Sequence, residues 1–310
     1  MSAMRDALQS YLSMRRALGF KLVCDGTGLM SFVGFLEQVG AEYVSTEHAL
    51  AWALLPTSVQ PVQWARRLGF VRGFAQYCAA FDARTEVPPV DLLPYSHQRR
   101  APFYFSDEDI RALLRGAMAI SARDGLANHT YYCLLGLLSV CGMRISEALN
   151  LTMDDVDLDE GILTIRSTKF GKSRLVPLHQ STVKVLADYK ERRAHFLNGR
   201  QVPHWFVNRR GERVRCDAVD GWFRRLTQKL GLVGKNGQRN PRLHDLRHRF
   251  AVTTLLRWYG DGEDIERRLP VLSAYLGHVE VRDTYWYLSA CPQLLAAATK
   301  RLEQRWEAAP

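Results

Sequence analysis

The chain has 310 residues, of which 47% are hydrophobic, and its formal net charge is +10 with an isoelectric point near 9.5. This length suits about two domains with cores of their own, and the composition excludes an intrinsically disordered chain. The basic surplus favours a polyanionic partner such as nucleic acid, although a merely basic surface would give the same total.

The six cysteines are scattered without the spacing of a metal site or of a disulfide framework, so neither zinc nor disulfides are expected. The start of the chain mixes charges into a helical pattern, which excludes a secretory signal there. The longest apolar run, residues 131–143, is shorter than the roughly 20 residues that a membrane span needs. These features predict a soluble cytoplasmic protein without a membrane partner.

Residues 1–82 predict a small all-α domain. Apolar residues recur at helical spacing within 28–39, and Ser45 or Thr46 can cap the next helix. A fourth helix turns three arginines outward, which makes them candidate DNA contacts: Arg66, Arg67 and Arg72. The expected helices cover 4–18, 28–39, a segment after residue 45, and 62–81.

Residues 83–102 contain four prolines and no helical pattern, so they predict a semi-rigid linker between two domains. Arg99 and Arg100, at its end, could lie along a phosphate backbone.

Residues 103–310 predict a second domain that is mostly α with a small antiparallel sheet. Ser106 opens it with a capping box, and the helix expected over 128–141 is apolar nearly all round, as a buried helix would be. Alternation over 161–168, a basic turn and a returning segment, 174–178, predict a β-hairpin. Further helices are expected over 145–151, 180–197, 216–230 and 241–259, before Gly277, and over 293–306, with a possible short strand at 205–207.

Arg144 lies two residues past Gly142, the glycine that should end the buried helix, so its side chain should be held stiffly. A planar guanidinium offers a fork of donors that matches two phosphate oxygens. Glu147 shares its helical face and could orient that fork. A purely structural Arg–Glu pair is the alternative.

His244 and Arg247 are separated by one helical turn near a helix N-terminus, which itself favours an anion. A histidine there can donate to a phosphate or exchange protons near neutral pH. At the hairpin tip, Lys169, Lys172 and Arg174 suit a DNA groove, and Lys169 could protonate a leaving alkoxide. A solvated basic turn is the alternative for that tip.

His278 follows a leucine and a glycine at a helix end, and Tyr287 lies nine residues further on. Taken singly, His278 could be a helix cap and Tyr287 a core residue, with Tyr285 as a competing nucleophile. Taken with the upstream groups, they supply one nucleophile and five side chains that can bind or protonate a phosphate. The residues therefore predict a phosphoryl-transfer site that acts on nucleic acid.

In this order the motifs resemble those of the tyrosine recombinases, also called the λ-integrase family. Residues 142–149, Gly-Met-Arg-Ile-Ser-Glu-Ala-Leu, are similar to the box around the first catalytic arginine of the family. His244, Arg247 and His278 match the second box. The family spacing of nine residues after that last histidine selects Tyr287.

The resemblance extends over essentially the whole chain, and Lys169 falls where the lysine of the family precedes a strand, here 174–178. It implies an all-α core-binding (SAM-like) domain over 1–82, the linker, and an α+β catalytic domain over 103–310. None of the six positions that match catalytic residues departs from the family pattern.

The resemblance also implies the chemistry. Tyr287 would attack a scissile DNA phosphate, forming a 3′-phosphotyrosine bond and releasing a 5′-hydroxyl, while Arg144 and Arg247 hold the non-bridging oxygens. Lys169 would act as general acid, His244 would accept the phenol proton, His278 would donate to the phosphate, and Glu147 would support Arg144. Neither a metal nor another cofactor is expected.

By the same resemblance, the partners are double-stranded DNA with recombination sites and further copies of the chain in a tetramer. The helix over 293–306 would dock on a neighbouring copy, with packing on its own core as the alternative. Before residue 1 no arm-binding domain is expected, which favours a two-domain recombinase of a mobile element or an Xer-like one. Accessory factors are possible, and the expected place of action is the nucleoid of the bacterial cytoplasm.

Two other functions stay open. A type IB topoisomerase uses similar chemistry on one duplex, and it would relax supercoils without a defined site. A DNA-binding protein without enzymatic activity could use the same scaffold, but it would be expected to lack one of the six matching residues.

Overall fold

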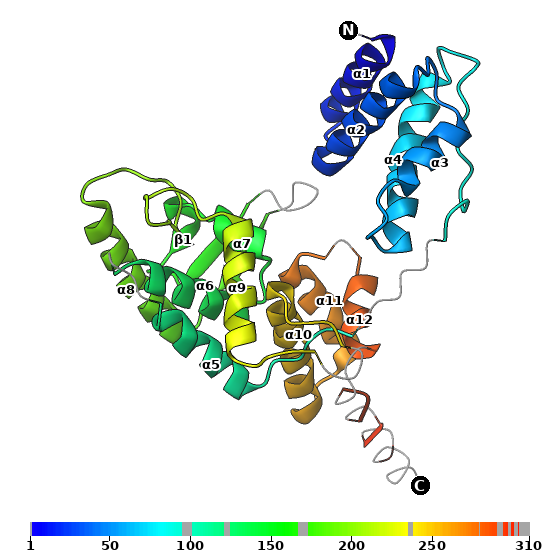
Figure 1. Cartoon of the computed structure of the whole chain (residues 1–310). Helices are drawn as coiled ribbons and strands as arrows, with labels where there is room; N and C mark the ends of the chain where they lie inside the picture. The colour runs from blue at the N-terminus through cyan, green and yellow to red at the C-terminus, as the bar shows by residue number, and fades with distance from the viewer. Residues whose placement is uncertain are drawn as a thin grey trace. The chain divides into compact units, whose positions relative to one another are not determined.

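The computed structural model describes residues 2–94, 101–120, 125–166, 173–234, 238–278, 280–289, 294–296, 299–300 and 303. Contacts divide the chain into two compact units, Met1–Arg99 and Arg100–Pro310 (Figure 1). Each unit has a hydrophobic core of its own.

In its described residues, 2–94, the first unit contains four helices. Their shared core is built from large apolar side chains such as Phe32, Trp52 and Phe74. Ser2 and Ser45 cap two of its helices through their hydroxyl oxygens, as the pattern at Ser45 predicts. Its helices are α1 (Ala3–Ala17), α2 (Val23–Val39), α3 (Thr46–Leu54) and α4 (Pro61–Cys78).

Two arginines of α4 turn inward, so their predicted outward orientation is wrong. Arg67 donates to the carbonyl oxygen of Trp52 at 2.8 Å, and its guanidinium lies 3.7 Å from the centre of the Trp52 ring. Arg72 donates to the carbonyl oxygens of Pro88 and Pro89 at 2.8 and 2.7 Å. Trp52 lies in the last turn of α3 and the two prolines lie outside regular structure, where carbonyl oxygens lack helical partners and a long arginine can supply donors.

Arg66 is exposed, and as DNA contacts all three arginines of α4 stay predictions. The first part of the predicted linker lies on this unit, because Glu86 accepts a hydrogen bond from the backbone of Thr46 at 2.8 Å. Arg99 and Arg100 lie outside the described residues.

The second unit is mostly helical with a small antiparallel sheet, which confirms the predicted fold class. The sheet has the order β1–β2–β3, and Leu163 pairs with Val176 in the predicted hairpin. The tip of that hairpin, with Lys169 and Lys172, lies outside the described residues. The strands are β1 (Val156–Asp157), β2 (Ile162–Ile165) and β3 (Arg174–Pro177).

The helices of the second unit are α5 (Asp107–Met118), α6 (Ala127–Cys141), α7 (Ile145–Asn150), α8 (Gln180–Leu197), α9 (Cys216–Lys229), α10 (Leu243–Gly260), α11 (Ile265–Leu276) and α12 (Arg282–Ser289), with a short 3-10 helix, η1 (Met153–Asp155). The helices from α5 to α11 follow the predicted spans closely, whereas α12 and the short 3-10 helix were not predicted. The expected strand at 205–207 is wrong. Only isolated bridges form there, at His204 and Val207. The apolar run reflects burial, since Trp205 and Phe206 are buried side chains of a loop.

Two hydrophobic clusters organise this unit. The larger joins α5, α6, α8, α9 and the sheet. The smaller joins α10, α11 and α12, which lie side by side, and it includes both Tyr287 and Leu294 (Figure 1). Leu294, at the start of the predicted terminal helix, is thus buried against its own chain. Leu295, the next residue of the predicted apolar stripe of this helix, is exposed, and the remaining members, Ala298, Leu302 and Trp306, lie outside the described residues.

Within the described part of the chain, no helix is both long and apolar enough to cross a membrane.

Candidate active site

Arg144 is placed by the end of a buried helix. Gly142 ends α6 in a left-handed conformation (φ 57°), and a Cβ there would lie 2.3 Å from the ring of Phe250. From the N-cap position of α7, the Arg144 guanidinium donates to Glu147 Oε1 at 2.8 Å and to the carbonyl oxygen of Gly277 at 3.2 Å. These contacts fix the guanidinium between α7 and the end of α11.

Glu147 is buried and binds two arginines. Its Oε2 accepts the backbone N–H of Arg144 at 2.8 Å, and Arg174 donates to both carboxylate oxygens, at 3.1 and 2.7 Å. Burial alone would raise the pKa of Glu147, but the hydrogen bonds and charges of the two arginines outweigh it and lower the pKa to about 2. The carboxylate is therefore ionised at neutral pH and fixes the orientation of Arg144.

Arg174, which begins β3, lies largely inside the protein, and its role as a DNA contact stays a prediction. Its side chain is only 11% exposed, and besides Glu147 it binds the carbonyl oxygen of Tyr275 through Nε at 2.7 Å. A Cβ at Gly277 would lie 2.8 Å from Arg174 Nη1, so a glycine is needed where the guanidinium crosses the end of α11. The guanidinium is engaged inside the protein because a buried carboxylate between α7 and β3 requires a full set of donors.

Arg247 is almost fully buried, at 1% exposure. It donates to the carbonyl oxygen of Gly142 at 2.9 Å and to that of Leu276 at 2.7 Å, and its Nε lacks a partner among the described residues. Burial lowers the pKa of Arg247, while the neighbouring Tyr287 and Glu147 act in the opposite direction. The arginine thus joins the ends of α6 and α11 to the tyrosine on α12.

His244 lies in the first turn of α10 and reaches solvent. Partial burial and the positive charges of Arg247, Arg239, Arg144 and Arg242 lower its pKa to about 4. The ring is therefore neutral near pH 7, and it stands in a positively charged environment where an anion would be stabilised.

His278 follows Gly277 beyond the end of α11. Its Nδ1 lies 2.7 Å from Oγ1 of Thr284, a hydroxyl that is fully buried on α12. Burial and the charges of Arg247 and Arg144 lower the pKa of His278 to about 4, against the opposing charge of Asp283. The neutral ring is thus oriented through one nitrogen, which leaves the other available to a ligand.

Tyr287 is 4% exposed, whereas Tyr285 is 54% exposed. The Tyr287 ring stacks on His278 with centroids 5.9 Å apart and planes at 20°. It also meets the edge of His248 at 4.8 Å and 81°. Of the two candidate nucleophiles, only Tyr287 lies in these contacts with the histidines.

The structure brings together five of the six predicted catalytic residues with Glu147; Lys169, the sixth, lies outside the described residues. Around Tyr287, Arg144 and Arg174 bind the carboxylate of Glu147, whereas Arg247 donates to backbone carbonyl oxygens and forms no ion pair among the described residues, which leaves positive charge in surplus. A site with this surplus can bind a phosphate and stabilise charge that develops on it.

Three further residues contact the site without having been predicted for it: His248, Thr284 and Trp286. His248 stacks on Trp286 with centroids 4.5 Å apart and planes at 17°. Helical spacing offered a usable signal, because His248 lies one turn after His244 and Thr284 one turn before Tyr287. Such spacing is common by chance and gives no chemistry without the fold.

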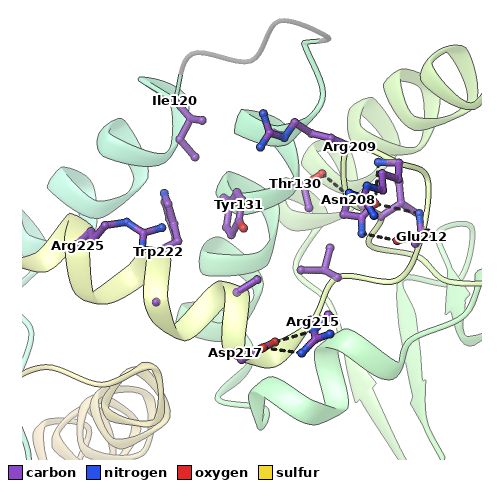
Figure 2. Close-up of a pocket in the computed structure, with 16 residues that line it drawn as sticks. Ile120, Thr130, Tyr131, Asn208, Arg209, Glu212, Arg215, Asp217, Trp222 and Arg225 are labelled. Carbon is purple, nitrogen blue, oxygen red and sulfur yellow. Dashed lines mark hydrogen bonds and ion pairs between the residues drawn. The ribbon is translucent and has the colours of Figure 1, made fainter.

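Among the described residues, no group of three or more histidine, cysteine, aspartate and glutamate side chains is placed to hold a metal ion. A cavity of about 650 Å³ lies elsewhere, between α6, α9 and the turn 207–212 (Figure 2). Figure 2 shows Tyr131 beside Trp222 in its wall, with Arg225 and Arg209 at its rim. This cavity shares no lining residue with the cluster around Tyr287.

Comparison with known proteins identifies the family. The model of the phage integrase family matches residues 107–293. The chain belongs to this family. A protein of Sinorhizobium fredii, provisionally described as an integrase/recombinase, is 50% identical over 99% of both chains. The tyrosine recombinase XerD of Pseudomonas aeruginosa is 30% identical over 86% of this chain and 82% of its own. This chain is thus a tyrosine recombinase by family.

Solved structures share its fold. The Tn1549 transposon integrase, in complex with transposon right end DNA, aligns with a TM-score of 0.63 over 96% of this chain and 98% of its own, at 17% identity. A λ integrase tetramer bound to a Holliday junction aligns with a TM-score of 0.61 over 91% of this chain and 76% of its own, at 16% identity.

Proposed function

We propose that this tyrosine recombinase cleaves and rejoins DNA strands at a specific site and that Tyr287 is its nucleophile. The observation that carries the proposal is the contact of one buried tyrosine with Arg247, His278 and His248 in a cluster of surplus positive charge. The phenol oxygen would attack the phosphorus of a scissile phosphodiester, and the bond from phosphorus to the 5′-oxygen would break. A 3′-phosphotyrosine and a free 5′-hydroxyl result, and attack by a 5′-hydroxyl reverses the step.

Arg144 and Arg247 would bind the two non-bridging oxygens of that phosphate. Both guanidiniums are already held by backbone carbonyl oxygens and, for Arg144, by Glu147, so they need little rearrangement when charge develops. Removing one preorganised donor of this kind costs about 3–4 kcal/mol of transition-state stabilisation.

The two histidines would exchange hydrogen bonds or protons with the phosphate and the phenol. A neutral His244, open to solvent beside the buried arginines, can accept the phenol proton. A neutral His278 can donate to a phosphate oxygen with the nitrogen that Thr284 does not bind. Lys169 would donate the proton that the departing 5′-oxygen needs. This step requires no bound metal or cofactor.

The partners proposed from these relatives are a DNA duplex with recombination sites and three further copies of the chain. The first unit and the basic residues Arg66, Arg67, Arg72, Arg99, Arg100 and Lys172 would contribute to DNA binding. Residues 293–306 would engage a neighbouring copy beyond Leu294, which lies on its own core. Residues 283–288 resemble mobile-element integrases more than Xer proteins, which favours a mobile-element role, and we expect the protein to act in the bacterial cytoplasm.

The decisive experiment traps covalent protein–DNA adducts on nicked duplexes that lose a short fragment after cleavage, with metal ions chelated. The wild-type chain and Tyr285→Phe should form an adduct that maps to Tyr287. Tyr287→Phe should bind the same DNA and form none. Equal loss in both variants would refute the assignment of the nucleophile.

Adduct formation together with plasmid relaxation and strand joining separates this function from its two rivals. A topoisomerase would relax supercoiled plasmid without a defined site, and a DNA-binding protein would bind tightly without any adduct. A recombinase should join ends only between duplexes that carry its site.

A further inference from the structure

His248 is a buried titratable residue that the proposed chemistry does not use. It lies on α10 one residue after Arg247, and only 7% of it is exposed. Its ring contacts two consecutive residues of α12, stacking on Trp286 and meeting Tyr287 edge to face. These contacts make His248 the point at which α10 holds the helix that carries the nucleophile.

The polar side of His248 has no evident structural use. Its Nδ1 is buried and has no hydrogen-bond partner among the described residues. A buried polar atom without a partner destabilises a protein by roughly 1–3 kcal/mol relative to a satisfied one. A leucine would fill a core position without this cost, so the presence of a flat ring at this position requires another explanation.

The environment keeps this ring uncharged. Burial, followed by the charges of His244, Arg239 and Arg247, lowers the pKa of His248 to about 3. It therefore adds no further positive charge beside the arginines, and its flat faces remain free for stacking on Trp286.

Two rings constrain the orientation of the Tyr287 phenol. The His278 ring is nearly parallel to it, at 20°, and the His248 ring is nearly perpendicular, at 81°. A parallel contact alone leaves the phenol able to slide in its own plane, and a perpendicular contact opposes that motion. The pair thus restricts both the tilt and the position of the phenol oxygen.

We propose that His248 is a positioning residue that holds Tyr287 in line for attack on the scissile phosphate. It acts through the nucleophile, by fitting its ring against Trp286 and Tyr287, and it touches neither the phosphate nor the leaving group. This inference rests on the proposed function of Tyr287. A misplacement of about 1 Å at a reacting atom can slow a reaction by roughly 100-fold, so loss of the ring should be measurable.

The test measures the first-order rate of adduct formation at saturating DNA, together with DNA affinity and the midpoint of urea unfolding. His248→Leu should slow adduct formation roughly 10- to 100-fold with unchanged affinity. His248→Phe, which keeps a flat ring, should recover most of the rate. Trp258→Leu is the matched control, because Trp258 lies on the same helix and in the same cluster and its ring faces Arg268. It should keep the wild-type rate.

A second substrate separates positioning from proton transfer. A duplex with sulfur in place of the scissile 5′-oxygen has a leaving group that departs without a proton. This substrate should not restore the rate of His248→Leu, because the misplaced phenol still has to attack. Restoration would overturn the proposal, and so would equal rates for the wild type and His248→Leu.

A measurement without DNA tests the same idea independently of catalysis. With 3-fluorotyrosine at position 287, the fluorine NMR signal of the wild type and of His248→Phe should be displaced from that of the unfolded chain. In His248→Leu the signal should move toward the unfolded position as the ring gains freedom. An unchanged signal would contradict positioning by His248. Failure of the wild type to form any adduct would instead refute the proposed function.

Discussion

Arg174 on β3 and Glu147 on α7 form a two-bond ion pair, with donor–acceptor distances of 3.1 and 2.7 Å. Glu147 also holds both the backbone and the side chain of Arg144. One carboxylate therefore connects the hairpin to the first predicted catalytic arginine. A displacement of the hairpin would be transmitted to Arg144 through this pair.

Replacement of Glu147 by glutamine should destabilise the protein strongly. The substitution leaves the guanidiniums of Arg144 and Arg174 without the buried carboxylate that pairs with them, and breaking a buried pair costs about 3–5 kcal/mol. Urea unfolding measures the loss. Glu108→Gln is the control, since Glu108 pairs with Arg111 on the surface, where an ion pair contributes less than about 1 kcal/mol. Similar losses of unfolding free energy in the two variants would show that the ion pairs of Glu147 stabilise the protein no more than a surface pair does.

Thr284→Val should slow DNA cleavage without unfolding the protein. Valine has nearly the shape of threonine but cannot bind His278 Nδ1, so the ring loses its orientation. A hydrogen bond of this kind contributes about 1 kcal/mol, which corresponds to a rate change of roughly 5- to 10-fold. Single-turnover adduct formation measures it. Thr284→Ser keeps the hydroxyl and should retain most of the rate; if serine fails as badly as valine, packing and not orientation explains the loss.

Arg66 and Arg72 should respond differently to replacement by alanine. Arg72→Ala removes two hydrogen bonds to proline carbonyl oxygens, so the first unit should lose about 1–2 kcal/mol of stability. Arg66 is exposed, and Arg66→Ala should leave stability unchanged. If Arg66 contacts a DNA phosphate, its loss should also make the slope of log affinity against log salt concentration shallower by about 1. Titrations at several salt concentrations distinguish the two effects.

Stability should fall as the pH drops below the ordinary pKa of histidine. The pKa of His248 is about 3 in the folded protein, below its usual 6.5, so between these values the unfolded chain binds the proton and the folded protein does not. The contribution of neutral His248 to the free energy of unfolding is fully present above pH 6.5 and is lost as the pH falls toward 3. His248→Phe should reduce the loss between pH 6.5 and 5 by about 2 kcal/mol.

Urea unfolding of both proteins across this range measures the difference. Replacement of the exposed His195 by asparagine is the control and should preserve the wild-type pH profile. Parallel profiles for the wild type and His248→Phe would contradict a neutral, buried His248.

The local patterns predicted most of the helices because their signals lie within one element. Gly142, the turn after it and Arg144 are contiguous, and His244 and Arg247 share one helical face. The partners of Arg174 could not be predicted in this way, since its contacts with Glu147 and Tyr275 cross between elements far apart in the chain. Arg67 and Arg72 show the same limit, because charge alone suggests an exposed side chain. β1, with two residues, is too short to show any alternation.

The carbonyl oxygens that bind Arg144 and Arg247 come from Leu276, Gly277 and Gly142, at the ends of two helices. They belong to the backbone, so no substitution of a side chain can delete them. A guanidinium has five N–H groups, so these bonds orient each arginine and leave further donors for a phosphate. Genetic change can therefore alter this anchoring only by disturbing the backbone bends that present the oxygens.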